Sequence, residues 1–317
     1  DGQSDAGAPA AAAMNSSDSS WQPVEADAEA ALRILGQPLE ALADGAVPAI
    51  VMRGSYPAEL CQRLHDRLLA EGLLYDPAGP VPEKFAEAGI PEGYYREGRQ
   101  GTERRAWQEN VASGRHRIDI GTSLGYRGSD PDAFFAHAAE THDLFARLPN
   151  PIDLIHDRLR ILSRGKRVRT AQEPDGRRYG PAIIRAHYGG YTYRPHFDSV
   201  RLREKREGYA VYHFEHQFAG VLVLRNSVRA GRVAEGILHR YLWQPEVQFY
   251  LDAGTFAEFA RERGLEQVQI QLDPGDLYFF NTRLIHEVPG VDGPEPRVVL
   301  ATFIGYSAER EDIFVWS

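Results

Sequence analysis

The sequence has few cysteines, no long apolar run and no excess of positive charge, and each absence narrows the possible functions. Cys61 is the only cysteine, so no disulfide can form within the chain, which predicts a reducing, cytoplasmic environment. No apolar stretch approaches the roughly 20 residues that cross a bilayer, which predicts no membrane partner. A formal charge of −9 argues against nucleic acid, because phosphate binding needs a basic surface, and it favours a small-molecule partner.

The first half of the chain predicts helices around a single strand, followed by irregular segments. Residues 1–20 are rich in Ala, Ser, Asp and Gly, which predicts a disordered tail, with Met14 as a candidate natural start. Apolar positions recur at helical spacing in three segments and form one short strand run: helices in 25–35, 56–72 and 131–162, broken at 149–151, and a strand in 47–52. Residues 75–115 have no period and predict an active-site cover, and residues 164–178 predict a basic loop.

After Tyr179 the sequence changes to short β-like segments separated by Gly and Pro, which favours a sandwich or jelly roll. The predicted strands are 182–188, 191–197, 218–224, 236–243, 268–272, 277–280 and 298–306. The predicted fold is therefore mainly β with flanking helices and a double-stranded β-helix (jelly-roll) core. Residues 21–178 are expected to supply helical support and lid segments, and residues 179–317 to form the core that carries the metal site.

A candidate metal site begins at His196-Phe197-Asp198. Residues i and i+2 of a strand point to the same side, so His196 and Asp198 can face one ion together. His286 follows a predicted strand and turn that can carry it to the same place. Two imidazoles and one carboxylate form the facial triad of mononuclear non-haem Fe(II) sites, which leaves coordination positions open for a co-substrate and O2.

A second His-x-carboxylate pattern competes with this one. His213-Phe214-Glu215 has the same spacing, and His216 adjoins it. It lacks the glycine-rich turn that precedes His196, so we interpret these residues as loop or strand-entry positions.

Arg297 lies a short distance after His286 and opens an apolar strand. A guanidinium group binds a carboxylate through two parallel hydrogen bonds, where lysine offers only a point charge. If the side chain points inward with Val299 and Ala301, it forms an anion clamp; the alternative is a surface arginine in a charged loop.

With these residues in place, the chain resembles the Fe(II)/2-oxoglutarate-dependent dioxygenase superfamily, particularly its prolyl-hydroxylase-like branch, over about residues 180–306. The resemblance implies that His196, Asp198 and His286 bind iron and that Arg297 binds the distal carboxylate of 2-oxoglutarate, with Tyr188 bonded to the same co-substrate. Some members have a serine two positions after the arginine, where this chain has Val299, so that contact is expected from Tyr188 or Thr302.

The chain is also similar to free-standing small-molecule hydroxylases and halogenases. In the halogenases glycine or alanine replaces the carboxylate ligand, whereas this chain has Asp198. The resemblance therefore implies hydroxylation of an unactivated C–H bond of a small molecule, such as an amino acid, an alkaloid or another natural-product intermediate, with Fe(II), 2-oxoglutarate and O2 consumed to give succinate and CO2. Two alternatives stay open: a non-catalytic jelly-roll protein that binds a metal or ligand, and a hydroxylase of a protein or carrier-bound substrate.

Overall fold

The computed structural model of the 317-residue chain describes residues 20–86, 114–124, 131–146 and 149–317. The helices are α1 Ala28–Leu35, α2 Pro38–Ala43, α3 Ala58–Ala70, α4 Glu83–Ala86, α6 Pro131–Ala146, α7 Pro151–Leu162, α8 Gln248–Ala253 and α9 Phe256–Glu262. The strands are β1 Val24–Glu25, β2 Ile50–Met52, β3 Arg117–Ile120, β4 Arg167–Thr170, β5 Ile183–His187, β6 Tyr193–His196, β7 His216–Arg225, β8 Val228–Arg229, β9 Arg232–Val233, β10 Gly236–Leu242, β11 Gln267–Ile270, β12 Leu277–Asn281, β13 Leu284–Val288, β14 Arg297–Tyr306 and β15 Asp312–Trp316.

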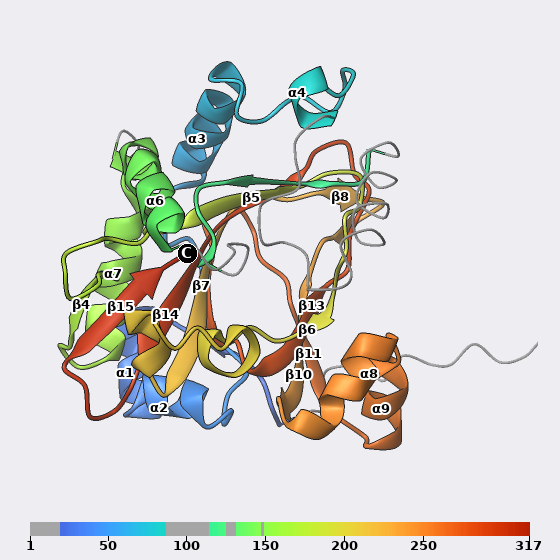
Figure 1. Cartoon of the computed structure of the whole chain (residues 1–317). Coiled ribbons are helices and arrows are strands. Elements are labelled where there is room, and N and C mark those ends of the chain that lie inside the picture. Colours follow the sequence, from blue (N-terminus) through green and yellow to red (C-terminus); the bar gives the residue numbers. More distant parts are fainter. Residues whose placement is uncertain (1–19, 87–113, 125–130, 147–148) are drawn as a thin grey trace, which may run out of the picture.

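Two sheets face each other and form the predicted jelly-roll core (Figure 1). The large sheet has the order β1-β2-β12-β7-β14-β15-β4, and β5 joins it by pairing with both β14 and β3. The small sheet has the order β11-β10-β13-β6. Strands from the first half of the chain, β1 to β4, therefore belong to the same sheet as the strands of the second half.

The large sheet has two faces with different partners. The inner face looks toward the small sheet, and side chains such as Val221, Tyr278 and Val299 form one apolar cluster with Leu238 and Leu284 of that sheet. The outer face is covered by α1, α2, α3 and α7, whose apolar side chains pack in a second cluster against the alternate residues of β5, β7, β12 and β14. Because successive side chains of a strand alternate, β7, β12 and β14 contribute to both clusters.

Local sequence signals explain several element boundaries. Asp27 caps α1 by accepting a hydrogen bond from the Ala30 N–H at 2.8 Å, and Asn150 caps α7 just before Pro151, as expected for helix N-termini. Gly275 forms the turn before β12 with φ 96°, and an added Cβ would lie 2.1 Å from the Tyr56 carbonyl oxygen. No other residue type fits there.

The structure also contains elements that the sequence did not predict. The basic segment 164–178 includes β4, which pairs in parallel with β15, and neither β15 nor β13 was expected as a strand. β15 contains Ile313-Phe314-Val315-Trp316, which are all strong β formers, so the sequence carried a signal for this strand that was missed. Most of the predicted active-site cover, residues 87–113, lies outside the described residues, as does the predicted N-terminal tail apart from Ser20.

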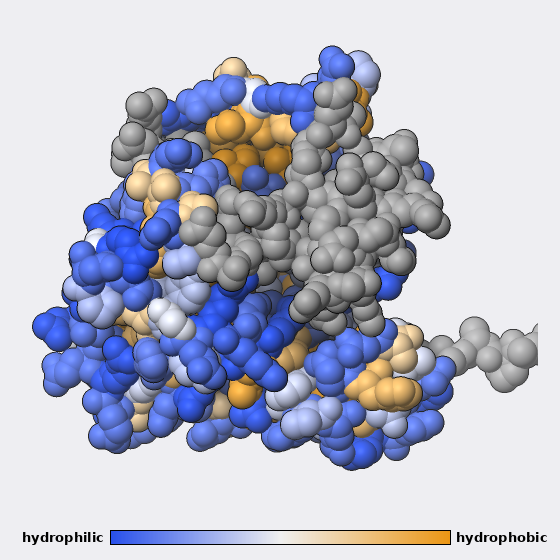
Figure 2. Space-filling model, viewed as in Figure 1, coloured by the Kyte–Doolittle hydropathy of each residue, from blue (hydrophilic) through white to orange (hydrophobic). Residues whose placement is uncertain are grey.

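No helix in the described part of the chain is long and apolar enough to cross a membrane. Charged and polar residues cover most of the visible surface, with an apolar patch over α8 and α9 (Figure 2). Phe249 of α8 is 71% exposed.

Candidate metal centre and co-substrate site

The small sheet places the three predicted metal ligands together. His196 ends β6 and lies directly opposite His286 of β13 in the small sheet, and Asp198 follows two residues after His196. The Asp198 Oδ2 atom lies 3.6 Å from His196 Nε2 and 3.3 Å from His286 Nε2. All three ligand atoms lie within 4.8 Å of one another, and this is the only such group of His, Cys, Asp or Glu among the described residues.

The backbone fixes the orientation of both imidazole rings. His196 Nδ1 lies 2.6 Å from the Arg194 carbonyl oxygen, and His286 Nδ1 lies 2.7 Å from the Leu284 carbonyl oxygen. A carbonyl oxygen only accepts, so each Nδ1 carries the hydrogen and each Nε2 presents a lone pair toward Asp198. Ring nitrogens held in this way are typical of metal-binding histidines, so the residues present fit a divalent metal ion such as Fe(II).

Asp198 is held by its backbone and by one of its carboxylate oxygens. Its N–H donates to the Thr282 carbonyl oxygen at 3.0 Å, and the Thr282 hydroxyl lies 2.8 Å from the Asp198 carbonyl oxygen. Arg203 Nη1 donates to Asp198 Oδ1 at 3.2 Å and to the Phe197 carbonyl oxygen at 2.9 Å. The Oδ1 atom is thus engaged by Arg203, while Oδ2 faces the two imidazoles.

Arg203 reaches Asp198 because a π-helical turn, Val200–Glu204, follows the metal-binding strand. The Ser199 hydroxyl caps this turn by accepting from the Leu202 N–H at 2.9 Å, and the Gln217 side chain accepts from the Val200 N–H at 2.9 Å. The turn thus directs Arg203 to the carboxylate of a proposed metal ligand.

The electrostatics of the cluster favour an anionic Asp198 carboxylate and a neutral His196 ring. Burial alone would raise the pKa of the Asp198 carboxyl, but His196 and His286 hold it well below its usual range. Burial, with a smaller contribution from His286, lowers the pKa of His196. A deprotonated carboxylate and unprotonated imidazoles are the forms that bind a metal.

Arg297 begins β14 on the inner face of the large sheet. It is 8% exposed, and its neighbours two and four positions along, Val299 and Ala301, belong to the inner apolar cluster. Burial lowers the pKa of its guanidinium, while Tyr278 acts in the opposite direction. The surface-arginine alternative is therefore wrong, and a buried guanidinium in this position is suited to bind an anionic group.

The structure brings further polar residues to this face that sequence reasoning did not assign. His187 of β5 lies opposite Arg297 on one side and Arg117 of β3 on the other. Arg117 Nη1 and Arg185 Nη1 donate to the Tyr193 hydroxyl at 2.6 and 3.0 Å. Strand alternation could have identified His187 and Arg185 from the sequence. These two residues lie two positions apart and so on the same face of the sheet, whereas Tyr188, the next residue, lies on the opposite face.

Tyr188 and Thr302 lie on the outer face, away from Arg297. The Tyr188 ring is stacked on Tyr75, with centroids 4.3 Å apart, and its hydroxyl donates to the Tyr75 carbonyl oxygen at 3.0 Å. The Thr302 hydroxyl lies 3.1 Å from the Pro181 carbonyl oxygen and 3.0 Å from that of Trp316. Both side chains thus have partners within the fold, and we leave both out of the co-substrate site proposed below.

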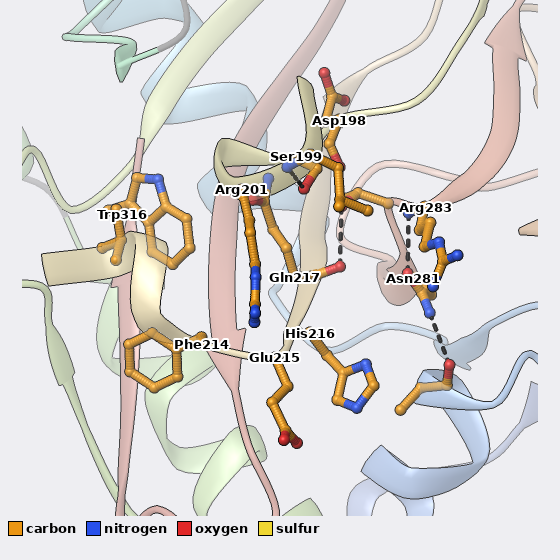
Figure 3. Close-up of a pocket in the computed structure, with 14 residues that line it drawn as sticks. Asp198, Ser199, Arg201, Phe214, Glu215, His216, Gln217, Asn281, Arg283 and Trp316 are labelled. Atoms are coloured by element: carbon orange, nitrogen blue, oxygen red, sulfur yellow. Dashed lines mark hydrogen bonds between the residues drawn. The ribbon is translucent and has the colours of Figure 1, made fainter. Parts of the chain in front are cut away.

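A pocket of about 270 Å³ lies behind the metal ligands. Asp198 stands at one end with its carboxylate pointing away, and Gln217, His216 and Glu215 line the pocket further along (Figure 3). The competing pattern of the sequence thus places Glu215 and His216 at this pocket rather than at the triad. Tyr209 and Phe214 belong to a core cluster, and Tyr193 lies beside His196 with ring centroids 4.7 Å apart.

A jelly roll with a His–Asp–His cluster at its mouth and a buried arginine between its sheets defines a mononuclear Fe(II)/2-oxoglutarate-dependent oxygenase. The family model of the carrier-protein-independent halogenase WelO5 matches residues 24–317, and the chain belongs to this family. The superfamily predicted from the sequence is confirmed, and with it the cofactor class of iron, 2-oxoglutarate and O2.

Comparison with solved structures supports the fold. The chain is similar to an N-substituted L-amino acid dioxygenase from Burkholderia ambifaria AMMD, with 15% identity over 88% of this chain and 90% of that chain and a TM-score of 0.50. A second structure of that enzyme, in complex with alpha-ketoglutarate, has 13% identity, coverage of 89% and 91%, and the same TM-score. No curated protein sequence matches the chain significantly.

Proposed function

We propose that the chain hydroxylates an unactivated C–H bond of a free small molecule, with Fe(II), 2-oxoglutarate and O2. The observation that carries this proposal is Asp198, whose Oδ2 atom completes a facial triad with His196 and His286. In the bound state, iron together with 2-oxoglutarate and O2 supplies the oxidising chemistry, and succinate and CO2 are the co-products. The protein supplies position and electrostatics.

Arg297 is the residue that binds the distal carboxylate of 2-oxoglutarate in this proposal. It is buried on the inner face, and between it and the metal ligands lie Tyr278 and Phe280, whose rings stack with centroids 5.3 Å apart. Phe280 in turn contacts His286, with ring centroids 5.0 Å apart. An extended dicarboxylate that reaches from the metal to Arg297 along these rings is shielded from water, which strengthens its ion pair with the guanidinium.

Asp198 also supports hydroxylation over halogenation, although the family model is named for a halogenase. His196, Asp198 and His286 would supply three protein ligands to iron, so the protein would leave no ligand position vacant for a halide beside 2-oxoglutarate and O2. Arg203 bonds the Asp198 carboxylate and the Thr282 carbonyl oxygen accepts from the Asp198 N–H, so the side chain and the backbone of Asp198 are both held in place.

The substrate is proposed to be a free small molecule because the family is described as independent of a carrier protein. A protein or carrier-bound substrate is the second candidate, and the non-catalytic alternative is disfavoured by the family and by a triad that leaves one face open. We also propose that residues 179–317 form the catalytic core and that residues 21–178 support it. A cytoplasmic location is likewise a proposal.

The test is an anaerobic titration of the Fe(II)-loaded protein with 2-oxoglutarate, in which the weak visible charge-transfer band of the chelate is recorded with and without chloride. We expect the band to form with the same apparent affinity in both buffers. A band that needs or shifts with chloride would favour a halogenase. A protein that binds iron but gives no band would favour the non-catalytic alternative.

A further inference from the structure

His187 is a buried polar side chain whose ring nitrogens have no hydrogen-bond partner among the described residues. It is 5% exposed and lies on the inner face between Arg117 and Arg297. Burial, reinforced by these two arginines, keeps its pKa well below the ordinary value, so the ring is neutral and offers one donor and one acceptor. Native proteins rarely leave such a group unsatisfied, and a ligand is one way to complete it.

Two guanidinium groups meet beside this ring. Arg117 Nη1 and Arg185 Nη1 both donate to the Tyr193 hydroxyl, at 2.6 and 3.0 Å. Asp119 lies on their other side, 3.2 Å from Arg117 Nε and 3.9 Å from Arg185 Nε. The carboxylate thus orients both groups from the Nε side, and their terminal nitrogens converge on one point. Planar charged donors held in this way recognise a carboxylate with defined geometry.

This convergence point is close to the metal ligands and distinct from Arg297. The Tyr193 ring lies 4.7 Å from the His196 ring and 5.6 Å from the His187 ring, centroid to centroid. Arg297 lies one strand further, next to Tyr278. An anion bound next to the Tyr193 hydroxyl and the two guanidinium groups would therefore lie close to the metal ligands while Arg297 remains available to the co-substrate.

We propose that Arg117, Arg185, Tyr193 and His187 form a second anion site that binds a carboxylate of the organic substrate. The inference rests on the proposed function, because it presumes that 2-oxoglutarate occupies Arg297. It identifies the substrate as a carboxylic acid whose reactive carbon lies a few bonds from the carboxylate. The site acts by positioning, since holding this group fixes which C–H bond faces the metal.

Trifluoroacetate is a suitable probe, because it is a small carboxylate whose ¹⁹F nuclei relax faster near a paramagnetic ion. The protein is loaded with Co(II) and saturated with 2-oxoglutarate, and ¹⁹F relaxation is followed as trifluoroacetate is added. We expect a saturable enhancement in the wild type. In Arg117→Gln and Arg185→Gln the dissociation constant of trifluoroacetate rises by about tenfold or more, as expected for loss of a charged hydrogen bond.

Arg194→Gln is the matched control, because Arg194 is exposed on the same strand as Tyr193 and its substitution should leave the constant unchanged. Tyr193→Phe keeps the ring beside His196 and removes only the oxygen, so it carries the test if the buried arginine variants do not fold. We expect it to weaken trifluoroacetate binding several-fold. Arg297→Gln should weaken 2-oxoglutarate and leave the trifluoroacetate constant unchanged.

Two outcomes would overturn the inference. One is a wild-type protein that binds 2-oxoglutarate normally but gives no saturable enhancement with trifluoroacetate. The other is a loss of 2-oxoglutarate affinity in Arg117→Gln and Arg185→Gln as large as in Arg297→Gln, which would assign the group to the co-substrate. Failure of the proposed function itself gives a different result, because the wild type would then not bind 2-oxoglutarate at all.

Discussion

The two faces of the large sheet use neighbouring residues of the same strands for different purposes. On the inner face, His187 and Arg297 lie side by side near the metal ligands. On the outer face, Tyr188 and Thr302 bond to the backbone of other segments and stabilise the fold. Neighbouring residues of a strand point to opposite faces of the sheet. The role of a residue in a motif therefore follows from the motif only when the strand register is also known.

The packing of the outer face explains why it holds no part of the proposed active site. Its side chains pack with those of α1, α2, α3 and α7 in a continuous apolar cluster, and a polar group there must find a partner within the protein. The inner apolar cluster contains no side chain of β3 or β5, and Arg117 and Arg185 of these strands are held by Tyr193 and Asp119. The following substitutions test this division, and they are ordered by the expected size of their effect.

The largest effect is expected at the metal ligands. Asp198→Ala or His286→Ala removes one of three donors, and we expect the affinity for Mn(II) to fall by more than about 100-fold, because even loss of a supporting contact costs 10–100-fold. Isothermal titration calorimetry measures it. The matched control is Glu287→Gln, which changes the next residue of β13 on the opposite face. A similar loss in that control would show that the strand and not the ligand had been disturbed.

Arg297→Gln is expected to reduce 2-oxoglutarate affinity by on the order of 3–5 kcal/mol, since the distal carboxylate would then be buried without its partner. The melting temperature should change little by comparison. Thr302→Val, on the outer face of the same strand, should reverse this pattern: normal 2-oxoglutarate binding but a free energy of unfolding lowered by about 1–3 kcal/mol, because buried carbonyl groups lose a donor. Titration of 2-oxoglutarate into the Mn(II)-loaded variants, with urea unfolding, measures both quantities.

Arg203→Gln is expected to weaken metal binding by about 10–100-fold, the range found when contacts that orient a ligand are lost. Without the guanidinium, the Asp198 carboxylate is free to rotate away from the two imidazoles. Removal of a positive charge acts in the opposite direction, but Arg203 has a side chain 34% exposed and solvent screens this contribution. Arg201→Gln, in the same turn, is the control. Equal metal affinity in wild type and Arg203→Gln, at equal stability, would exclude the positioning role.

The smallest effect is expected at Tyr188. Tyr188→Phe removes the hydrogen bond to the Tyr75 carbonyl oxygen and retains the stacked ring, so we expect a loss of about 0.5–1.5 kcal/mol of stability and no change in 2-oxoglutarate affinity. Chemical denaturation and the anaerobic titration measure the two. A Tyr188→Phe variant with weaker 2-oxoglutarate binding and unchanged stability would return Tyr188 to the co-substrate site.

The sequence contains enough information for the fold class and for the three proposed ligands that the structure brings together, because they depend on short-range rules. The spacing of His196 and Asp198 places them on one side of a strand, and the glycine turn before them is observed with Gly189 and Gly190 at φ 63° and 75°. The inward direction of Arg297 also followed from its alternation with Val299 and Ala301. Such features need only local geometry.

Other features depend on pairing between distant segments, and local sequence patterns do not predict which segments pair. β3 pairs with β5, and this places Arg117 and Asp119 beside His187 and Arg185, although the four alternating residues of β3 were too short a signal to predict this pairing. The π-helical turn that directs Arg203 to Asp198 likewise depends on Gln217, from a different strand. Motif resemblance placed Tyr188 at the co-substrate, one residue away from the side chain that faces Arg297.

The most direct test of this account is a crystal structure of the protein with Mn(II) and 2-oxoglutarate. We predict an anomalous difference peak between His196 Nε2, His286 Nε2 and Asp198 Oδ2, with the distal carboxylate of 2-oxoglutarate on Arg297 at the inner face. A metal at another site, or a distal carboxylate bound by Tyr188 or Thr302 at the outer face, would contradict it.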